Sequence, residues 1–108
     1  MKTYEGRREG YAAIVTVDGR PLNPRLDLWN HSPTGFEWGY CGSGPAQLAL
    51  AILADHLGDD RQALDVYQRF KWVAVVELPR RRWKLTSHEI DVLLQFVQEA
   101  QTVSGGVV

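Results

Sequence analysis

Apolar and polar positions follow a short period in the first half of the chain, up to about residue 40. Residues 11–17 are rich in apolar and β-branched side chains and end at Asp18-Gly19, a strong hairpin signal. Residues 25–29 and 36–40 alternate between apolar and polar side chains, as half-buried strands do. Turn-forming residues separate these segments. We therefore predict three early strands that form a meander.

In the second half the period lengthens to that of a helix. Residues 47–57 are almost wholly apolar on every side, a pattern that only a helix surrounded by the core tolerates. Pro45 suits the first position of this helix, and Gly58 suits its C-terminus. A second helix is expected over residues 61–70, with one of the two preceding aspartates as its N-cap.

Two further elements complete the pattern. Residues 72–78 form a continuous apolar run, which is typical of a strand buried on both faces. Residues 86–89 read Thr-Ser-His-Glu, a capping box that predicts the start of a third helix. We therefore predict an α+β fold: a single two-layer domain with a mainly antiparallel N-terminal sheet plus one late strand, packed by three helices. The domain is expected to span residues 1–101, and residues 102–108 are expected to fray.

The composition favours one folded domain. The chain has 108 residues, of which 44% are hydrophobic and 23% are charged, a balance that argues against wholesale disorder. Its formal net charge of −1 gives no overall attraction to nucleic acid. A local basic patch remains compatible with this balance.

Cys41 is the single cysteine, which excludes an internal disulfide and a zinc site made of four cysteines. The first residues lack the apolar stretch of a signal peptide, and the longest apolar run, residues 48–54, is too short to span a membrane. We therefore expect a soluble, cytoplasmic protein with no membrane partner. Between an aromatic segment and a glycine turn, Cys41 is expected to be a small buried hydrophobe.

The first candidate site is the turn Gly42-Ser43-Gly44 before the long apolar helix. The free N–H groups at a helix N-terminus attract anions, and glycine lets a ligand approach the backbone. The spacing matches neither the dinucleotide-binding nor the P-loop fingerprint, and Pro45 removes one donor. Two interpretations stay open: a structural turn capped by Ser43 or Gly44, or a site for a nucleotide or another small anion.

Glu37 is the second candidate, because it lies on the opposite face of the aromatic segment 36–40. If that face is covered, the carboxylate needs a partner. Arg20, Arg25 and Arg69 are the expected partners. A structural ion pair and recognition of a ligand or partner are the two interpretations.

His31 completes the ligand-binding candidates, provided that it converges on one open pocket with Glu37 and Ser43. A catalytic pair of Cys41 and His31 would need a third orienting group, which the spacing does not supply. The three histidines show no metal-ligand spacing. The sequence thus predicts no catalytic residue, no metal and no cofactor.

A basic segment around one aromatic residue is the third candidate: Arg80, Arg81, Arg82, Trp83 and Lys84. Basic residues can contact phosphates while the aromatic ring stacks on a base. Tryptophan and arginine are equally enriched in protein-binding hot spots. A solvated loop with the Trp83 ring folded back is the third interpretation.

Residues 35–53 read GFEWGYCGSGPAQLALAIL, preceded by NHSPT at 30–34, and residues 67–71 read YQRFK. These segments resemble the motif GFEWGY-x-GSGPAQLALAIL of a domain-of-unknown-function family of small bacterial, plasmid and phage proteins. The resemblance extends over about residues 2–97, and Cys41 stands where the motif is expected to have glycine. It carries over no catalytic residue, but it implies a mobile-genetic-element setting.

Small proteins in such a setting often act by binding, an argument from context alone. We expect a non-enzymatic binding protein with a protein partner, such as a counter-defence inhibitor of the anti-CRISPR type. One alternative is a binder of nucleotides or other small anions at residues 42–44. Another is nucleic-acid binding through residues 80–84.

Overall fold

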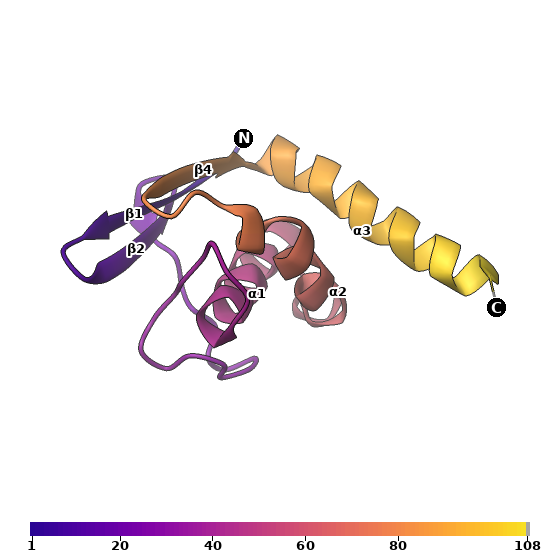
Figure 1. The fold of residues 1–108 in the computed structure, drawn as a ribbon, viewed down its shortest axis with the longest axis horizontal. Coiled ribbons are helices and arrows are strands. Elements are labelled where there is room, and N and C mark those ends of the chain that lie inside the picture. Colours follow the sequence, from indigo (N-terminus) through magenta and orange to yellow (C-terminus); the bar gives the residue numbers. More distant parts are fainter. Residues whose placement is uncertain (108) are drawn as a thin grey trace.

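The computed structural model describes the backbone of residues 1–107 and the side chains of residues 1–97. Its four strands form one antiparallel sheet in the order β3-β2-β1-β4. Three helices accompany the sheet within these residues, so the predicted α+β class is confirmed (Figure 1). The elements are β1 (Thr3–Glu9), β2 (Ala12–Val17), β3 (Arg20–Pro21), α1 (Ser43–Leu57), α2 (Asp60–Val73), the 3-10 turn η1 (Val75–Glu77), β4 (Arg82–Thr86) and α3 (Ser87–Val107).

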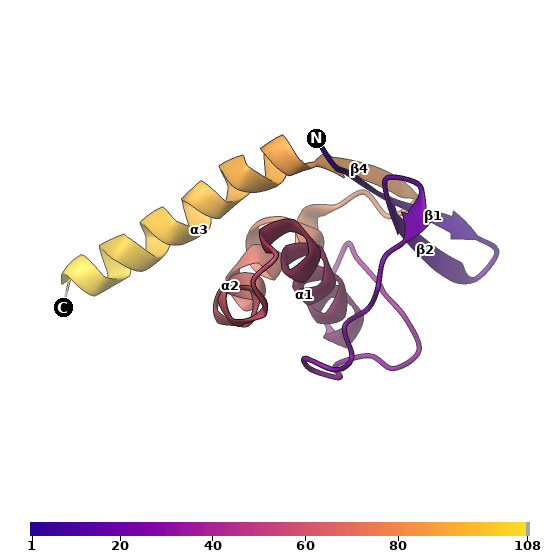
Figure 2. The same ribbon diagram turned by 180° about the vertical axis from the view of Figure 1, so that it is seen from behind.

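The helices α1 and α2 lie together on one side of the sheet, whereas α3 leaves the end of β4 and runs away from it (Figures 1 and 2). Every residue of α1 from Gly44 to Ala54 is buried. The expectation of a central helix covered all round is therefore confirmed. Gly58 ends this helix in the left-handed conformation, with φ of 65°, as its position suggested.

The sheet has a buried face and an exposed face, because side chains alternate along each strand. β1 lies between β2 and β4, and Gly6 is paired with Val15 on one side and Trp83 on the other. Tyr4, Val15, Trp83 and Leu85 contribute to the core. The charged residues between them lie on the exposed face: Glu5, Arg7, Arg82 and Lys84.

The close approach of β1 and the Trp83 ring requires a glycine at position 6. A Cβ atom there would lie 2.2 Å from Trp83 Nε1. The indole is 4% exposed and meets the Trp38 ring edge-on, with ring centroids 5.7 Å apart. Its Nε1 is the one buried side-chain nitrogen or oxygen without a hydrogen-bond partner among the described residues. Trp83 is thus part of the core.

The predicted strands over 25–29 and 36–40 are wrong. Arg25 takes a left-handed φ of 55° that starts a turn, and the second segment pairs with no strand. Gly39, with φ of 83°, donates its N–H to Val75 O instead. The strand β1 was not predicted, because its residues TYEGRRE are too polar to show an apolar alternation. The strand over 11–17 and the Asp18-Gly19 hairpin are confirmed.

The predicted strand over 72–78 is wrong, and the late strand of the sheet is instead β4, which begins at Arg82. The apolar run 72–78 is the end of α2 followed by η1, with Trp72 57% exposed and Val75 buried. The strand is β4, whose alternation of basic and apolar residues was assigned to a loop. A sheet with one exposed face explains the difference, since its strands alternate rather than carry continuous apolar runs.

The helix ends follow local chemistry closely. Asp59 caps α2 by accepting a hydrogen bond from Gln62 N at 3.1 Å. The capping box is confirmed: Thr86 N donates to Glu89 Oε1 at 2.9 Å, and Glu89 N donates to Thr86 Oγ1 at 3.2 Å. Pro45 is the third residue of α1, not the first, because the helix begins at Ser43.

The backbone of α3 continues to Val107, and side chains beyond residue 97 and all of residue 108 lie outside the part described. The domain boundary at residue 101 and the fraying of residues 102–108 stay predictions.

Candidate functional site

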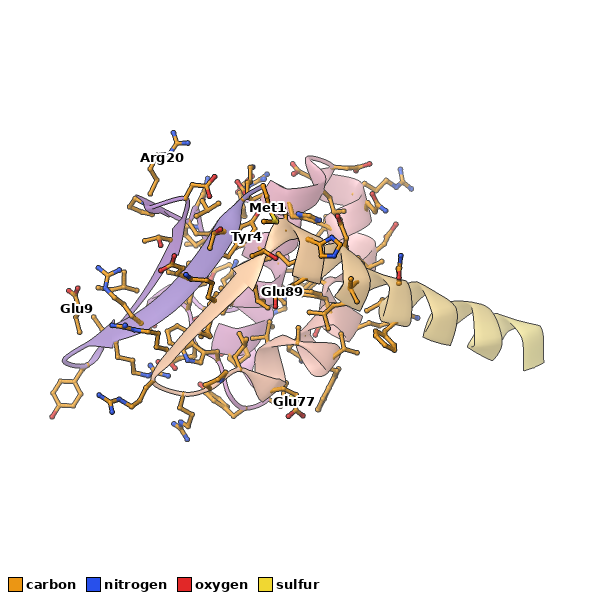
Figure 3. All side chains as sticks on the ribbon, turned by 90° about the horizontal axis from the view of Figure 1, so that it is seen from above. Met1, Tyr4, Glu9, Arg20, Glu77 and Glu89 are labelled. Atoms are coloured by element: carbon orange, nitrogen blue, oxygen red, sulfur yellow. The ribbon has the colours of Figure 1, made fainter. Side chains whose placement is uncertain are left out.

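Five arginines from two distant segments meet at the hairpin end of the sheet. Arg7 and Arg8 come from β1, and Arg80, Arg81 and Arg82 come from the loop before β4 and its first residue. The antiparallel register sets Arg7 beside Arg82. A hollow of about 490 Å³ is lined by Arg7, Arg8, Arg81 and Arg82. We call the five arginines, together with Lys84 further along β4, the arginine surface. Figure 3 shows this end of the sheet, where Glu9 marks the hairpin end of β1.

Only part of this charge is neutralised within the protein. Arg7 pairs with Glu9 at 2.9 Å, and the Lys84 ammonium lies 4.0 Å from Glu5. Within residues 1–97, the side chains of the arginines at positions 80–82 form no ion pair within 4.0 Å. All three are exposed. A chain with net charge −1 therefore carries a strongly positive region at one end.

Arg8 holds this end of the molecule together. Its guanidinium forms a bidentate pair with Glu37, at 3.1 and 2.9 Å, and its Nε donates to Arg80 O at 2.9 Å. The same group lies over the Trp38 ring, 4.4 Å from its centroid. Trp38 Nε1 also donates to Arg80 O, at 3.0 Å. One arginine thus joins β1, the loop before α1 and the loop before β4.

The ion pair expected for Glu37 is present, but its partner is Arg8 and not Arg20, Arg25 or Arg69. The partner was missed because it lies on β1, which no local pattern had marked as a strand. Both side chains are partly exposed, at 26% for Arg8 and 34% for Glu37.

Arg25 instead links the irregular loop to the start of α2. Its guanidinium bonds Asp27 and Asp60, the latter at 2.8 and 3.0 Å. These hydrogen bonds lower the pKa of both carboxyl groups below their ordinary value. Arg25 therefore connects two other segments of the fold, and within residues 1–97 it shares no ion-pair partner with the arginine surface.

A second hollow, of about 580 Å³, adjoins the arginine surface and contains two tyrosines. Tyr11 on the β1–β2 turn is fully exposed, and Tyr40 is 42% exposed. Of the aromatic residues in the segment 36–40, Phe36 and Trp38 are buried and Tyr40 is not. We call this hollow the tyrosine pocket; its lining residues are Arg8, Gly10, Tyr11, Glu37, Tyr40 and Arg80.

The glycine turn before α1 packs tightly against its neighbours. A Cβ atom at Gly44 would lie 2.6 Å from Glu37 Cβ, and one at Gly42 would lie 2.9 Å from the Tyr40 ring. Gly42 is the N-cap without a side-chain hydrogen bond, and Ser43 is exposed. Neither of the caps expected from the sequence is used. These close contacts explain why both positions are glycine. An anion site at this turn stays a prediction.

His31 belongs to a separate cluster of side chains. Its Nε2 is 2.6 Å from Tyr67 Oη, and its ring stacks on Trp29 with centroids 5.8 Å apart. Burial, with a smaller contribution from Lys71, lowers the pKa of His31. The fully buried Gln47 side chain accepts the N–H groups of residues 31 and 32 and donates to the carbonyl of residue 24. The structure therefore joins Glu37 to the glycine turn and gives His31 other partners.

Three other expectations concern chemistry away from these hollows. Cys41 is exposed, so the expectation of a buried thiol is wrong; the turn that carries it lies outside the core. Among the residues with described side chains, no three His, Cys, Asp or Glu residues gather as metal ligands. Within residues 1–107, no helix is both long enough and apolar enough to cross a membrane.

Part of the arginine surface was predictable from the sequence. Arg80, Arg81, Arg82 and Lys84 were candidates, and the structure brings them next to Arg7 and Arg8 of β1. Trp83, inside that segment, faces the core and not the surface. The residues of the N-terminal hairpin were missed, although the Arg-Arg pair at positions 7 and 8 and the Gly-Tyr turn after it were visible signals.

Comparison with protein-family models matches residues 4–96 to a family of unknown function, DUF6166. No curated protein and no solved structure matches the chain.

Proposed function

The chain belongs to a family of unknown function, DUF6166, and we propose that it is a non-enzymatic protein that binds nucleic acid through the arginine surface. The observation that carries the proposal is the set of three exposed arginines at positions 80–82, which lack ion-pair partners within residues 1–97. Guanidinium groups bind phosphates through two parallel hydrogen bonds. A row of them fits a chain of phosphates better than a single anion.

The shape of the surface supports a polymer over a small molecule. Small-molecule sites are concave and mostly apolar, and they enclose most of their ligand. The hollow at the arginine surface is lined by four arginines and is open to solvent. A third hollow, lined by Glu5, Gly6, Arg7, Arg82 and Lys84, continues along the exposed face of the sheet. The positive charge therefore extends over several neighbouring positions, as the backbone of a nucleic acid requires.

The test is the salt dependence of binding to labelled oligonucleotides. Removing one arginine that binds a phosphate lowers the slope of log K against log salt by about 0.7 to 0.9. We expect the triple variant Arg80→Gln, Arg81→Gln, Arg82→Gln to bind less tightly and to lower this slope by about 2 to 3. Fluorescence anisotropy between roughly 50 and 200 mM salt measures both quantities.

The control replaces two exposed arginines that lie outside the arginine surface. Arg61 and Arg69 lie exposed on α2 and line none of the hollows at the sheet. Their replacement by glutamine leaves affinity and slope nearly unchanged if the arginine surface is the site. Equal losses in both variants, or no binding by the wild type at low salt, would overturn the proposal.

The finer expectations from the sequence concern origin and partner. A mobile-element origin and a counter-defence role through protein contact rest on the sequence resemblance, and they stay predictions. The partner that the arginine surface would fit in that case is an acidic protein surface. Binding to such a protein with no affinity for oligonucleotides would decide in its favour.

A further inference from the structure

We propose that the nucleic acid is single-stranded and that one of its bases stacks on Tyr11 or Tyr40 in the tyrosine pocket. This inference rests on the proposed function and names its substrate class. Bases in a single strand expose their flat faces, and aromatic side chains bind those faces with little regard to sequence. The tyrosine pocket adjoins the arginine surface and shares Arg8 with its hollow.

Hydrogen bonds and an ion pair link the residues at the floor of the tyrosine pocket. Arg8 uses three of its five N–H donors on the protein: one from each terminal nitrogen on Glu37 and its Nε–H on Arg80 O. The charge of this pair is balanced internally. Arg8 and Glu37 therefore hold the pocket in shape, and the net positive charge of its lining comes from Arg80.

Arg80 is positioned for a phosphate beside that pocket. Its carbonyl accepts hydrogen bonds from Arg8 and Trp38, which fixes its backbone. Its side-chain stem passes over Gly39, where a Cβ atom would lie 3.1 Å from Arg80 Cγ. A guanidinium carried by a held backbone segment loses less conformational freedom on binding than one on a mobile loop.

The two tyrosines frame the opening. Tyr40 rests on the glycine turn, where a Cβ atom at Gly42 would meet its ring at 2.9 Å. Tyr11 follows Gly10, whose positive φ of 61° belongs to the β1–β2 turn, and its side chain is fully exposed. An aromatic ring with no burial gives the fold little, so the fold does not account for it.

A duplex would not use these rings, because its bases are stacked on one another and only their edges are accessible in the grooves. The pocket is open and lies at the end of the sheet, so an unpaired base can enter from solvent. The phosphates on either side of that base would then lie near the arginine at position 80 and the arginines that follow it.

The experiment compares three probes by fluorescence anisotropy: an oligothymidylate about 12 nucleotides long, the same strand with abasic sites, and a duplex of equal length. We expect at least one of Tyr11→Ala and Tyr40→Ala to weaken binding to the thymidylate strand by roughly 5- to 150-fold, which identifies the ring that stacks on the base. Binding to the abasic strand and the duplex should change less than twofold. Tyr40→Phe should keep most of the affinity, because it retains the ring.

Phe96→Ala is the matched control, since Phe96 is a 60% exposed aromatic on α3 outside the pocket. The inference is overturned if the wild type binds the duplex and the strand equally, or if neither tyrosine variant weakens binding to the thymidylate strand more than binding to the duplex. That outcome leaves the arginine surface intact as a nucleic-acid site. Absence of binding to every probe overturns the proposed function itself, so the two failures are distinct.

Discussion

The region around α1 and the arginine surface differ in whether their polar side chains have partners within the protein. Around α1, the one fully buried polar side chain, Gln47, has three hydrogen-bond partners. At the arginine surface, three exposed guanidinium groups have no ion-pair partner within residues 1–97. Burial makes an unpaired polar group costly, whereas solvent makes an unpaired charge cheap to keep. The fold therefore requires no partner for these three arginines, and it does not explain why they gather at one end of the sheet.

The boundary between the two regions runs through β1 and β4. Trp83 and Gly6 face the core, and Arg82 and Arg7 lie beside them on the exposed face. Arg8 connects the two regions, since it forms hydrogen bonds with Glu37 within the protein while the residues next to it on β1 are exposed. Substitutions on either side of this boundary should separate stability from binding.

The largest effect is expected from Gly6→Ala. The new Cβ atom would lie 2.2 Å from Trp83 Nε1, so the indole or the β1 backbone must shift. Overpacking of this kind costs about 3 kcal/mol of unfolding free energy, or roughly 12 to 24 °C in Tm. Thermal and urea denaturation measure it. In the background of Trp83→Phe, which shortens the ring system, the same substitution should cost much less; an equal cost would contradict the contact.

Gln47→Leu should have the next largest effect. The N–H groups of His31 and Ser32 and the carbonyl of Pro24 would lose their partner. Leaving such groups unpaired costs about 2 kcal/mol in a partly buried setting. Urea denaturation gives the decrease in stability, and oligonucleotide affinity of the folded variant should match the wild type. A neutral substitution would show that water replaces the amide.

Arg8→Leu tests the residue that joins both regions. The variant loses the pair with Glu37, the bond to Arg80 O and the stacking on Trp38. We expect urea denaturation to show a decrease of about 1 to 2 kcal/mol in stability, because the pair is only partly buried.

The control for Arg8 is its neighbour on the exposed face. Arg7→Leu removes only a surface pair with Glu9 and should change stability by less than about 0.5 kcal/mol. The Arg8 variant should also weaken binding to single strands, since the loops of the tyrosine pocket lose their link. Equal stability of the two variants would contradict the inference that Arg8 links β1 to the two loops.

The smallest effect concerns His31 and pH. Burial lowers its pKa in the folded state below the ordinary 6.5, so the unfolded chain binds the proton more readily. Stability is then greatest above pH 6.5 and falls as the pH drops from there toward the folded-state pKa. His31→Gln should flatten this part of the profile, measured by urea denaturation between about pH 5 and 8. An unchanged slope would assign the dependence to another group.

Local patterns predicted the helical half of the fold well and the sheet poorly. The apolar run 47–57, the cap at Asp59 and the capping box at 86–89 each specify structure within a few residues. The strands β1 and β2 form a local hairpin, but β1 is too polar to show an apolar alternation, and its pairing with β4 joins residues about 80 positions apart, which no local pattern contains. Thus β1 was missed, and β4 was assigned to a loop although its alternation was present.

At the site, two features could be derived from the residues alone: a basic segment at 80–84, and a need for a partner at Glu37. The fold was required to show that the segment contains a strand whose tryptophan is buried, and that Arg8 is the partner. A strand divides its residues between two faces, and packing against the rest of the chain selects which face is buried. That selection leaves the arginines exposed, and it sets them beside two tyrosines from elsewhere in the chain.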